Sequence, residues 1–293
     1  IARVKRQLNR ELVIGGILLT IRTAGVQFRK FGYAMKNTLG KIFKKTEAAE
    51  GEVTPFQAVT TALAATVGTG NIAGVCGAIA IGGPGAVFWM WIAAFLGMMT
   101  NYSENVLGIF YRRRNENGEW SGGAMYYLQD GLGSKKGCKG IGKVLAILFA
   151  VFTLLASFGI GAMGQVNKIV VNIESAFPVE ALANVQLYEG VSLYSLIIGL
   201  VLVALAAAIP LGGLKRVAAF AEKVVPFMVV LFIAGSIIIV GVNYANIIPA
   251  FGAIFKTAFS PIAAVGGVTG AAIKTVMVQG FKRGVFSNEA GLG

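Results

Sequence analysis

The 293-residue sequence contains no histidine and only two cysteines. Histidine is the commonest metal ligand and the side chain that titrates nearest neutral pH, so its absence removes the usual metal and proton-transfer chemistry. Cys76 lies in a long apolar run and Cys138 in a basic segment, which argues against a disulfide or a metal site. Charge is also scarce, because no charged residue occurs between Glu52 and Glu104.

The composition is that of a membrane protein. Charged residues make up 13% of the chain, against about 25% in soluble proteins, and hydrophobic residues make up 56%. One membrane span needs about 20 apolar residues, so the uncharged run holds two spans. The segment "IGGPGA", Ile81 to Ala86, is the expected turn between them, because its glycines and proline suit a tight helix hairpin. We therefore predict an all-α polytopic membrane protein.

The net charge of +13 is concentrated in alternate loops. Seven cations lie in Arg22–Glu52, seven in Arg112–Lys143, and smaller groups follow at Lys215, Arg216 and Lys223, and at Lys282 and Arg283. The intervening segment "NIESAFPVEALANVQLYEG" has no Lys or Arg. This alternation is the positive-inside rule, which places the basic loops in the cytoplasm. The basic charge is thus a topology signal, and we expect no nucleic-acid partner.

This orientation predicts a short first span at about Glu11–Val26, then a basic segment to Glu52 lying along the membrane surface. Six further spans follow. Thr54, Pro55 and Gln57 are expected to form a capping box at the start of the first of these six. Their approximate ranges are Thr54–Ile81, Pro84–Tyr111, Ile141–Val171, Val191–Leu211, Val224–Asn243 and Ser260–Lys282. The basic pair Lys282 and Arg283 would mark a cytoplasmic loop after the last.

The stretch "ATVGTGNIAG", Ala65 to Gly74, fits a dinucleotide-binding fingerprint through Gly68, Gly70 and Ala73. That fingerprint requires a preceding strand and an acidic residue about 20 positions downstream, where this sequence reads "AVFWMWIAAF". The alternative is a spanning helix that unwinds at mid-membrane, where freed carbonyls hold an ion and freed amides hold a carboxylate. The other alternative is a helix that is kinked at these glycines and only packs against its neighbours.

Polar residues in other spans are further candidates. Gly161 and Gln165 are four residues apart and share a helix face, although Gln165 would serve equally well in an interhelical hydrogen bond. Glu104 lies eight residues before a cluster of arginines, so a position at the inner interface and a role in ion movement are both open. The role of Glu289 stays open.

The first and sixth of these spans run in opposite directions and share a pattern. "TPFQAV" at Thr54 is echoed by "SPIAAV" at Ser260, and the glycine-broken stretches "VGTGN" and "VGGVTGA" follow. Two interrupted helices at corresponding positions of inverted halves are typical of the binding site of a secondary transporter.

Several blocks together resemble the sodium:alanine symporter family. They are "LTIRT", "VQFRKFGYA", "EGEVTPFQA", "ATVGTGNIAG", "AIGGPGAVFWMW", "GGAMYYLQDGLG" and "GVFSNEAGLG", and the resemblance runs from about Ile17 to Gly293. It implies a leucine-transporter-type core of two inverted five-helix repeats behind an extra amino-terminal helix. It also implies uptake of alanine or glycine across the cytoplasmic membrane, coupled to Na⁺ or, in some members, to H⁺.

The resemblance also implies which residues bind. The substrate would be lined by Thr69, Gly70, Asn71, Gly161, Gln165, Thr269 and Gly270. Backbone oxygens around Ala64, Thr66 and Val67 would hold the sodium ion. These assignments come from the resemblance and stay expectations at this point.

The expected division is residues 1–52 as the amino-terminal span and basic segment, 53–243 as the first repeat, and 244–293 as the start of the second. On this division the chain is expected to be a fragment that lacks most of the second repeat. A passive channel or a structural membrane subunit are the alternative functions, whereas an enzyme is not expected, because the spans lack paired carboxylates. The sequence leaves the oligomeric state open.

Overall fold

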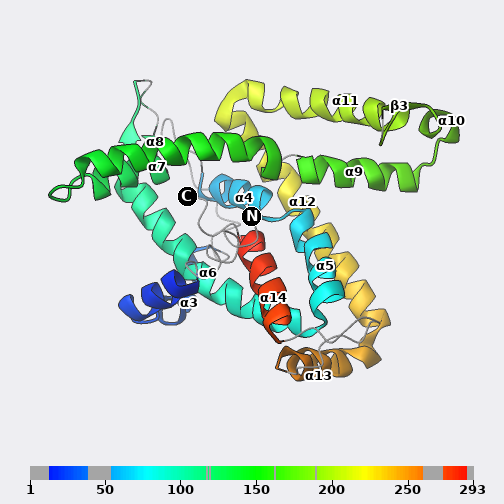
Figure 1. Cartoon of the computed structure of the whole chain (residues 1–293), viewed down its shortest axis with the longest axis horizontal. Helices are drawn as coiled ribbons and strands as arrows, with labels where there is room; N and C mark the ends of the chain where they lie inside the picture. Colours follow the sequence, from blue (N-terminus) through cyan, green and yellow to red (C-terminus); the bar gives the residue numbers. More distant parts are fainter. Residues whose placement is uncertain are drawn as a thin grey trace.

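The computed structural model describes residues 13–38, 54–116, 118, 120–161, 163–188, 190–259 and 273–288, and these are almost entirely helical (Figure 1). The amino-terminal part contains an apolar helix at Val13–Arg22, followed by α2 (Val26–Arg29) and α3 (Phe31–Asn37). Gly25 has φ +63°, a left-handed conformation that lets the chain turn between the first helix and α2. Phe28 packs on Phe95 with ring centroids 5.0 Å apart, which attaches this hairpin to α6.

The next part is a broken helix followed by a long one. α4 (Pro55–Thr66), η2 (Thr69–Asn71) and α5 (Ala73–Gly82) come first, and α6 (Gly85–Phe110) follows. The predicted capping box is confirmed, because the Gln57 amide donates to the Thr54 hydroxyl and the Thr54 amide donates to the Gln57 side chain, both at 3.1 Å. The predicted "IGGPGA" turn is confirmed by Gly83, whose φ is +74° between α5 and α6.

A compact basic connection follows α6. It contains the hairpin of β1 (Arg113–Arg114) and β2 (Trp120–Ser121), then α7 (Ala124–Tyr126) and the π-helical η3 (Tyr127–Leu132). Arg113 forms a salt bridge with Asp130, and the guanidinium of Arg112 lies 4.0 Å from the centroid of the Trp120 ring. These contacts order the segment that the charge pattern assigns to the cytoplasm.

The remaining elements form two long hairpins and a final helix. They are α8 (Lys139–Ala156), η4 (Ser157–Gly161), α9 (Met163–Ala176), α10 (Glu180–Ala183), β3 (Gln186–Tyr188), β4 (Val191–Ser192), α11 (Leu193–Ala208), η5 (Pro210–Gly212), α12 (Gly213–Val242), η6 (Tyr244–Asn246), α13 (Ile247–Ala258) and α14 (Ile273–Asn288). Figure 1 shows α9 and α11 side by side, joined through α10 and β3.

The best-packed region is where α14 meets α5 and α6 (Figure 1). Ala78, Ala86 and Val276 are completely buried there. Small residues permit the close approach: a β-carbon on Gly280 would lie 2.5 Å from the Ala86 carbonyl oxygen, and one on Gly284 would lie 2.6 Å from the Ala93 β-carbon. Close packing through small residues is the usual way in which helices associate within a membrane.

Fewer helices than predicted meet the length and composition of a membrane span. Among the described residues, Lys139–Ala176 and Arg216–Val242 do so alone, and the bent pair Phe56–Thr66 and Thr69–Gly82 would make a third. The apolar helices Val13–Arg22 and Leu193–Ala208 are shorter. These helices agree with an all-α membrane protein, while the prediction of six full spans goes beyond what they show.

One prediction on the last helix is wrong. Lys282 and Arg283 do not lie in a loop, because α14 continues through both and ends at Asn288. Arg283 lies against Gly74 and Gly77 of α5, where a β-carbon on either glycine would be in ordinary contact with its side chain. A basic pair does not always mark a loop, because a helix that packs against its neighbours can continue through it.

Candidate functional site

The break between α4 and α5 is the centre of the candidate site. α4 ends at Thr66, the chain extends through Val67 and Gly68, and a short 3-10 turn precedes α5. The axes of the two half-helices differ by 60°. The predicted interruption of the helix at Gly68 is therefore confirmed. A break leaves up to four carbonyls at the end of α4 and four amides at the start of α5 without intrahelical partners.

The side chain of Asn71 connects three segments at this break. Its Nδ2 donates to the Thr66 carbonyl oxygen at 3.3 Å, and its Oδ1 accepts a hydrogen bond of 2.8 Å from the Ser287 hydroxyl. Asn71 thus links the end of α4 to the turn and links the turn to α14. The structure brings together residues 216 positions apart in the sequence.

Gln165 approaches the same turn from α9. A β-carbon on Gly68 would lie 3.2 Å from the Gln165 Nε2, so the absence of a side chain at Gly68 lets this amide reach the backbone of the break. Gly161 ends the π-helical turn η4, just before α9. Single π-helical turns occur frequently at functional sites, because they reposition the side chains that follow. The structure therefore brings Gln165, one of the predicted residues, to the break.

Thr69 faces a groove beside the break. The groove has a volume of about 310 Å³ and runs along α9. Its walls are formed by Thr69, Lys168, Ile169, Asn172, Ile173, Ala176 and Phe177. Thr69 is thus accessible from one side of α9, and the apolar walls suit a small side chain.

The predicted ion-binding positions are also at the break. Ala64 and Thr66 lie in the last turn of α4, and Val67 follows it. The Val67 amide still donates to the Leu63 carbonyl at 2.8 Å, and the Thr66 carbonyl accepts from Asn71. Thr269 and Gly270, predicted to line the site from the sixth span, lie outside the described residues, as does Glu289.

Ser287 and Arg283 were missed by sequence reasoning. Both lie on the face of α14 that meets α5 and the break, since they are four residues apart. Ser287 belongs to the block "GVFSNEAGLG", which carried the family resemblance but received no role. The sequence feature that could have pointed to Ser287 is the polar pair Ser287 and Asn288 next to small residues. The "GTGN" turn has the same combination of small and uncharged polar residues.

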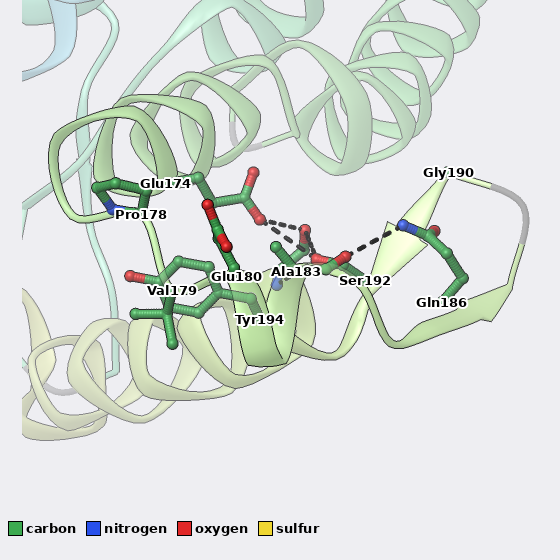
Figure 2. A pocket seen from close by; sticks show the side chains of 10 residues that line it. Glu174, Pro178, Val179, Glu180, Ala183, Gln186, Gly190, Ser192 and Tyr194 are labelled. Atoms are coloured by element: carbon green, nitrogen blue, oxygen red, sulfur yellow. Dashed lines mark hydrogen bonds between the residues drawn. The ribbon is translucent and has the colours of Figure 1, made fainter.

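A second pocket of similar size lies at the end of the hairpin of α9 and α11. Figure 2 shows that Glu174 points toward the start of α11, where its Oε1 accepts hydrogen bonds from Ser195 at 2.6 Å and from Ser192 at 3.4 Å. Ser192 also caps α11, because its hydroxyl accepts from the Ser195 amide. A carboxylate at a helix N-terminus is stabilising, so these contacts fasten the hairpin.

Two contacts lie at the ends of α4 and α6 that the charge pattern places in the cytoplasm. Gln57 of α4 donates to the Glu222 carboxylate of α12 at 2.8 Å. Near the end of α6, burial raises the pKa of Tyr127 in η3, and the charge of Glu104 in α6 raises this pKa further. Glu104 is therefore near the basic connection, which favours the inner interface over the middle of the membrane.

Comparison with known proteins adds the family context. The sequence pattern of the sodium:alanine symporter family matches residues 4–293. The sodium/alanine symporter AgcS of Methanococcus maripaludis is 46% identical over 283 residues, which cover 96% of this chain and 57% of that protein.

Two relatives from Bacillus subtilis are also similar. The putative sodium/proton-dependent alanine carrier protein YrbD is 39% identical over 278 residues, 95% of this chain and 51% of that protein. The probable sodium/glutamine symporter GlnT is 36% identical over 281 residues, 95% of this chain and 52% of that protein. The chain spans about half the length of the curated relatives it matches.

Proposed function

The chain belongs to the sodium:alanine symporter family, and we propose that its protein is a secondary transporter that couples Na⁺ entry to uptake of alanine or glycine. The observation that carries this proposal is the unwound turn at Gly68–Asn71, which meets Gln165 of α9 and Ser287 of α14. An unwound helix that meets uncharged polar side chains suits a zwitterion and a monovalent cation, because backbone groups supply partial charges of both signs.

In this proposal the two ends of the break bind different groups. The carbonyls of Ala64, Thr66 and Val67 hold Na⁺, since the last turn of a helix presents carbonyl oxygens that lack intrahelical partners; the Thr66 oxygen keeps a second lone pair beside its hydrogen bond from Asn71. Thr69, Gly70 and Asn71 hold the amino acid, together with Gly161 and Gln165. Ser287 is added to this set because it contacts Asn71. Thr269 and Gly270 remain in it as expectations from the family. H⁺ stays an alternative coupling ion, as the name of one relative indicates.

The different attachments of the two half-helices support a proposal for alternating access. α5 is held by close packing with α6 and α14 around Ala78, Ala86 and Val276, whereas α4 is joined to α12 through Gln57 and Glu222. The break lets one half tilt without the other. We propose that α4 moves with α12 to open the cytoplasmic side, while α5 stays with α14.

The fold proposed for the whole protein is an inverted pair of five-helix repeats in the cytoplasmic membrane, after an extra amino-terminal helix. The direction of α14 supports this. Val276, near its start, lies against Gly82 at the end of α5, while Ser287, near its end, contacts Asn71 before α5 begins. α14 therefore runs antiparallel to α5, as the first helix of an inverted repeat would. The division at 53–243 and 244–293 follows from the same proposal.

Uptake into proteoliposomes tests the function. The product of the complete gene is reconstituted, and labelled alanine, glycine and glutamine are compared under an inward Na⁺ gradient and with K⁺ in its place. Saturable alanine or glycine uptake that requires Na⁺ supports the proposal. Uptake that rises linearly with concentration and ignores Na⁺ favours a channel, and no uptake at all favours a structural subunit. Dominant glutamine uptake would contradict the preference for a small substrate.

A further inference from the structure

The rotation of α14 about its axis is fixed by its packing on α6. Gly280 and Gly284 lie four residues apart on one face, where they approach Ala86 and Ala93 too closely for any side chain. At about 100° per residue, Arg283 is about 60° from Gly280 around the helix, and Ser287 lies between the two. This edge of the glycine face meets α5 and the break, because Arg283 lies against Gly74 and Ser287 contacts Asn71, so Arg283 is held toward them.

Arg283 lies about one helical turn from the contact between Ser287 and Asn71, on the side of Gly82. A β-carbon on Gly74 would lie 3.6 Å from both the Cδ and the Nη1 of Arg283, and one on Gly77 would lie 3.9 Å from its Nη2. The guanidinium is thus laid along the first turns of α5, which begins at Ala73.

The charge of Arg283 is not balanced by any described residue. Its Nε is buried and has no hydrogen-bond partner in the part of the chain that the structure describes, and the salt bridge found there joins Arg113 to Asp130 instead. The start of a helix carries partial positive charge, which makes an arginine beside it less favourable still. Charged side chains inside a membrane protein are costly and are usually paired or functional. An anion beside Arg283 would offset this cost.

We propose that Arg283 binds the carboxylate of the transported amino acid, at a subsite one helical turn from Asn71 toward Gly82. This inference rests on the proposed transport function. A guanidinium suits the role, because it donates two parallel hydrogen bonds to a carboxylate and stays charged at any physiological pH. Arg283 thereby selects substrates that carry a free carboxylate.

The anion beside Arg283 could also be a carboxylate side chain from elsewhere in the protein. Measurements of thermal stability distinguish this source from the substrate carboxylate. The complete gene product is purified with Na⁺, and its apparent melting temperature is measured across a series of alanine concentrations. The variants are Arg283→Gln, Arg283→Lys and, as the matched control from the same turn of α14, Lys282→Gln.

If Arg283 binds the substrate, Arg283→Gln melts without alanine at the wild-type temperature or above it, because an unpaired charge has been removed. It then needs roughly 10- to 100-fold more alanine for the same rise in melting temperature. Arg283→Lys recovers part of this loss, and Lys282→Gln matches the wild type.

A wild-type alanine response in Arg283→Gln overturns the inference. So does a lower melting temperature of Arg283→Gln without alanine, because that result assigns Arg283 to a carboxylate of the protein. A wild-type protein whose melting temperature ignores alanine contradicts the proposed function itself, which is a distinct outcome.

Discussion

The Ser287 hydroxyl donates a 2.8 Å hydrogen bond to the Asn71 Oδ1, while the Nδ2 of the same amide donates to the Thr66 carbonyl. Asn71 is therefore oriented by two partners on different helices. Its amide has one remaining hydrogen to donate and one remaining lone pair to offer. The Asn71 amide is therefore a fixed polar group at the break. Its orientation depends on α14 as much as on the end of α4.

The first prediction concerns this hydrogen bond. We expect Ser287→Ala to weaken Na⁺-dependent alanine binding roughly 5- to 20-fold, since Asn71 then loses the partner that orients it. Asn71→Ala removes the amide itself and should weaken binding more. Equilibrium binding of labelled alanine by the complete gene product measures both.

A double-mutant cycle provides the check. The double variant should bind no more weakly than Asn71→Ala alone, because the two residues act as one unit. Ser236→Ala is the control, since Ser236 bonds only the Phe232 carbonyl on its own exposed helix face. Fully additive losses for Ser287 and Asn71 would show that the hydrogen bond has no role in binding.

The second prediction concerns Thr69, which faces the groove along α9. Thr69→Val keeps the shape of the side chain and removes its hydroxyl. We expect alanine to bind about 10-fold more weakly while expression stays normal, because a hydrogen bond to a charged ligand is lost. Thr38→Val is the matched control, since the Thr38 hydroxyl bonds only the Ala34 carbonyl in α3. An unchanged alanine affinity would remove Thr69 from the site.

The third prediction tests the close packing of α14 on α6. Gly280→Ala introduces a β-carbon 2.5 Å from the Ala86 carbonyl oxygen and the Trp89 β-carbon, and backbone cannot yield as a flexible side chain does. We expect a destabilisation of about 1–3 kcal/mol. The apparent melting temperature in detergent should therefore fall by several degrees.

Gly235→Ala in α12 is the control for this change. Nothing lies within 4 Å of a β-carbon at Gly235, and alanine favours a helix over glycine by up to about 1 kcal/mol. This variant should be at least as stable as the wild type. A Gly280→Ala protein as stable as Gly235→Ala would contradict the packing of α14 on α6.

Features encoded by neighbouring residues could be predicted from the sequence, and contacts between distant segments could not. The capping box needs only Thr54, Pro55 and Gln57, and the break needs only the glycines beside Asn71. The contact of Asn71 with Ser287 depends on how two helices far apart in the chain pack together. No local pattern records such packing, so only Gln165, a polar residue in an apolar span, indicated a partner in advance.

Arg283 illustrates a second limit of sequence reasoning. Counting positive charges assigns every basic pair to a loop, because an isolated charge in a membrane is costly. The structure places this arginine beside Gly74 and Gly77, and that position depends on how α5 and α14 pack together. Charge counting therefore fails where tertiary packing brings another helix against a basic side chain.

The last prediction concerns the start of the broken helix, the end that the charge pattern places in the cytoplasm. Gln57 donates a 2.8 Å hydrogen bond to Glu222, which ties α4 to α12. Glu222→Ala removes the acceptor, so α4 should separate from the neighbouring helices more often. Thr60 reports this motion, because it lies one turn further along α4 and is only 2% exposed. In a background with Cys76→Ser and Cys138→Ser, we expect Thr60→Cys to react with a thiol reagent several-fold faster once Glu222 is alanine.

Two controls decide whether the contact between Gln57 and Glu222 is responsible. Glu222→Gln retains a carbonyl oxygen that accepts from Gln57, so the labelling rate should rise less than in the alanine variant. Glu180→Ala removes a carboxylate from α10, far from α4, and should leave the rate unchanged. Because the contact restrains α4 rather than the substrate, alanine affinity should change little when Na⁺ is saturating. Equal labelling rates in Glu222→Ala and the wild type would show that α4 is held by its apolar packing on α12 alone.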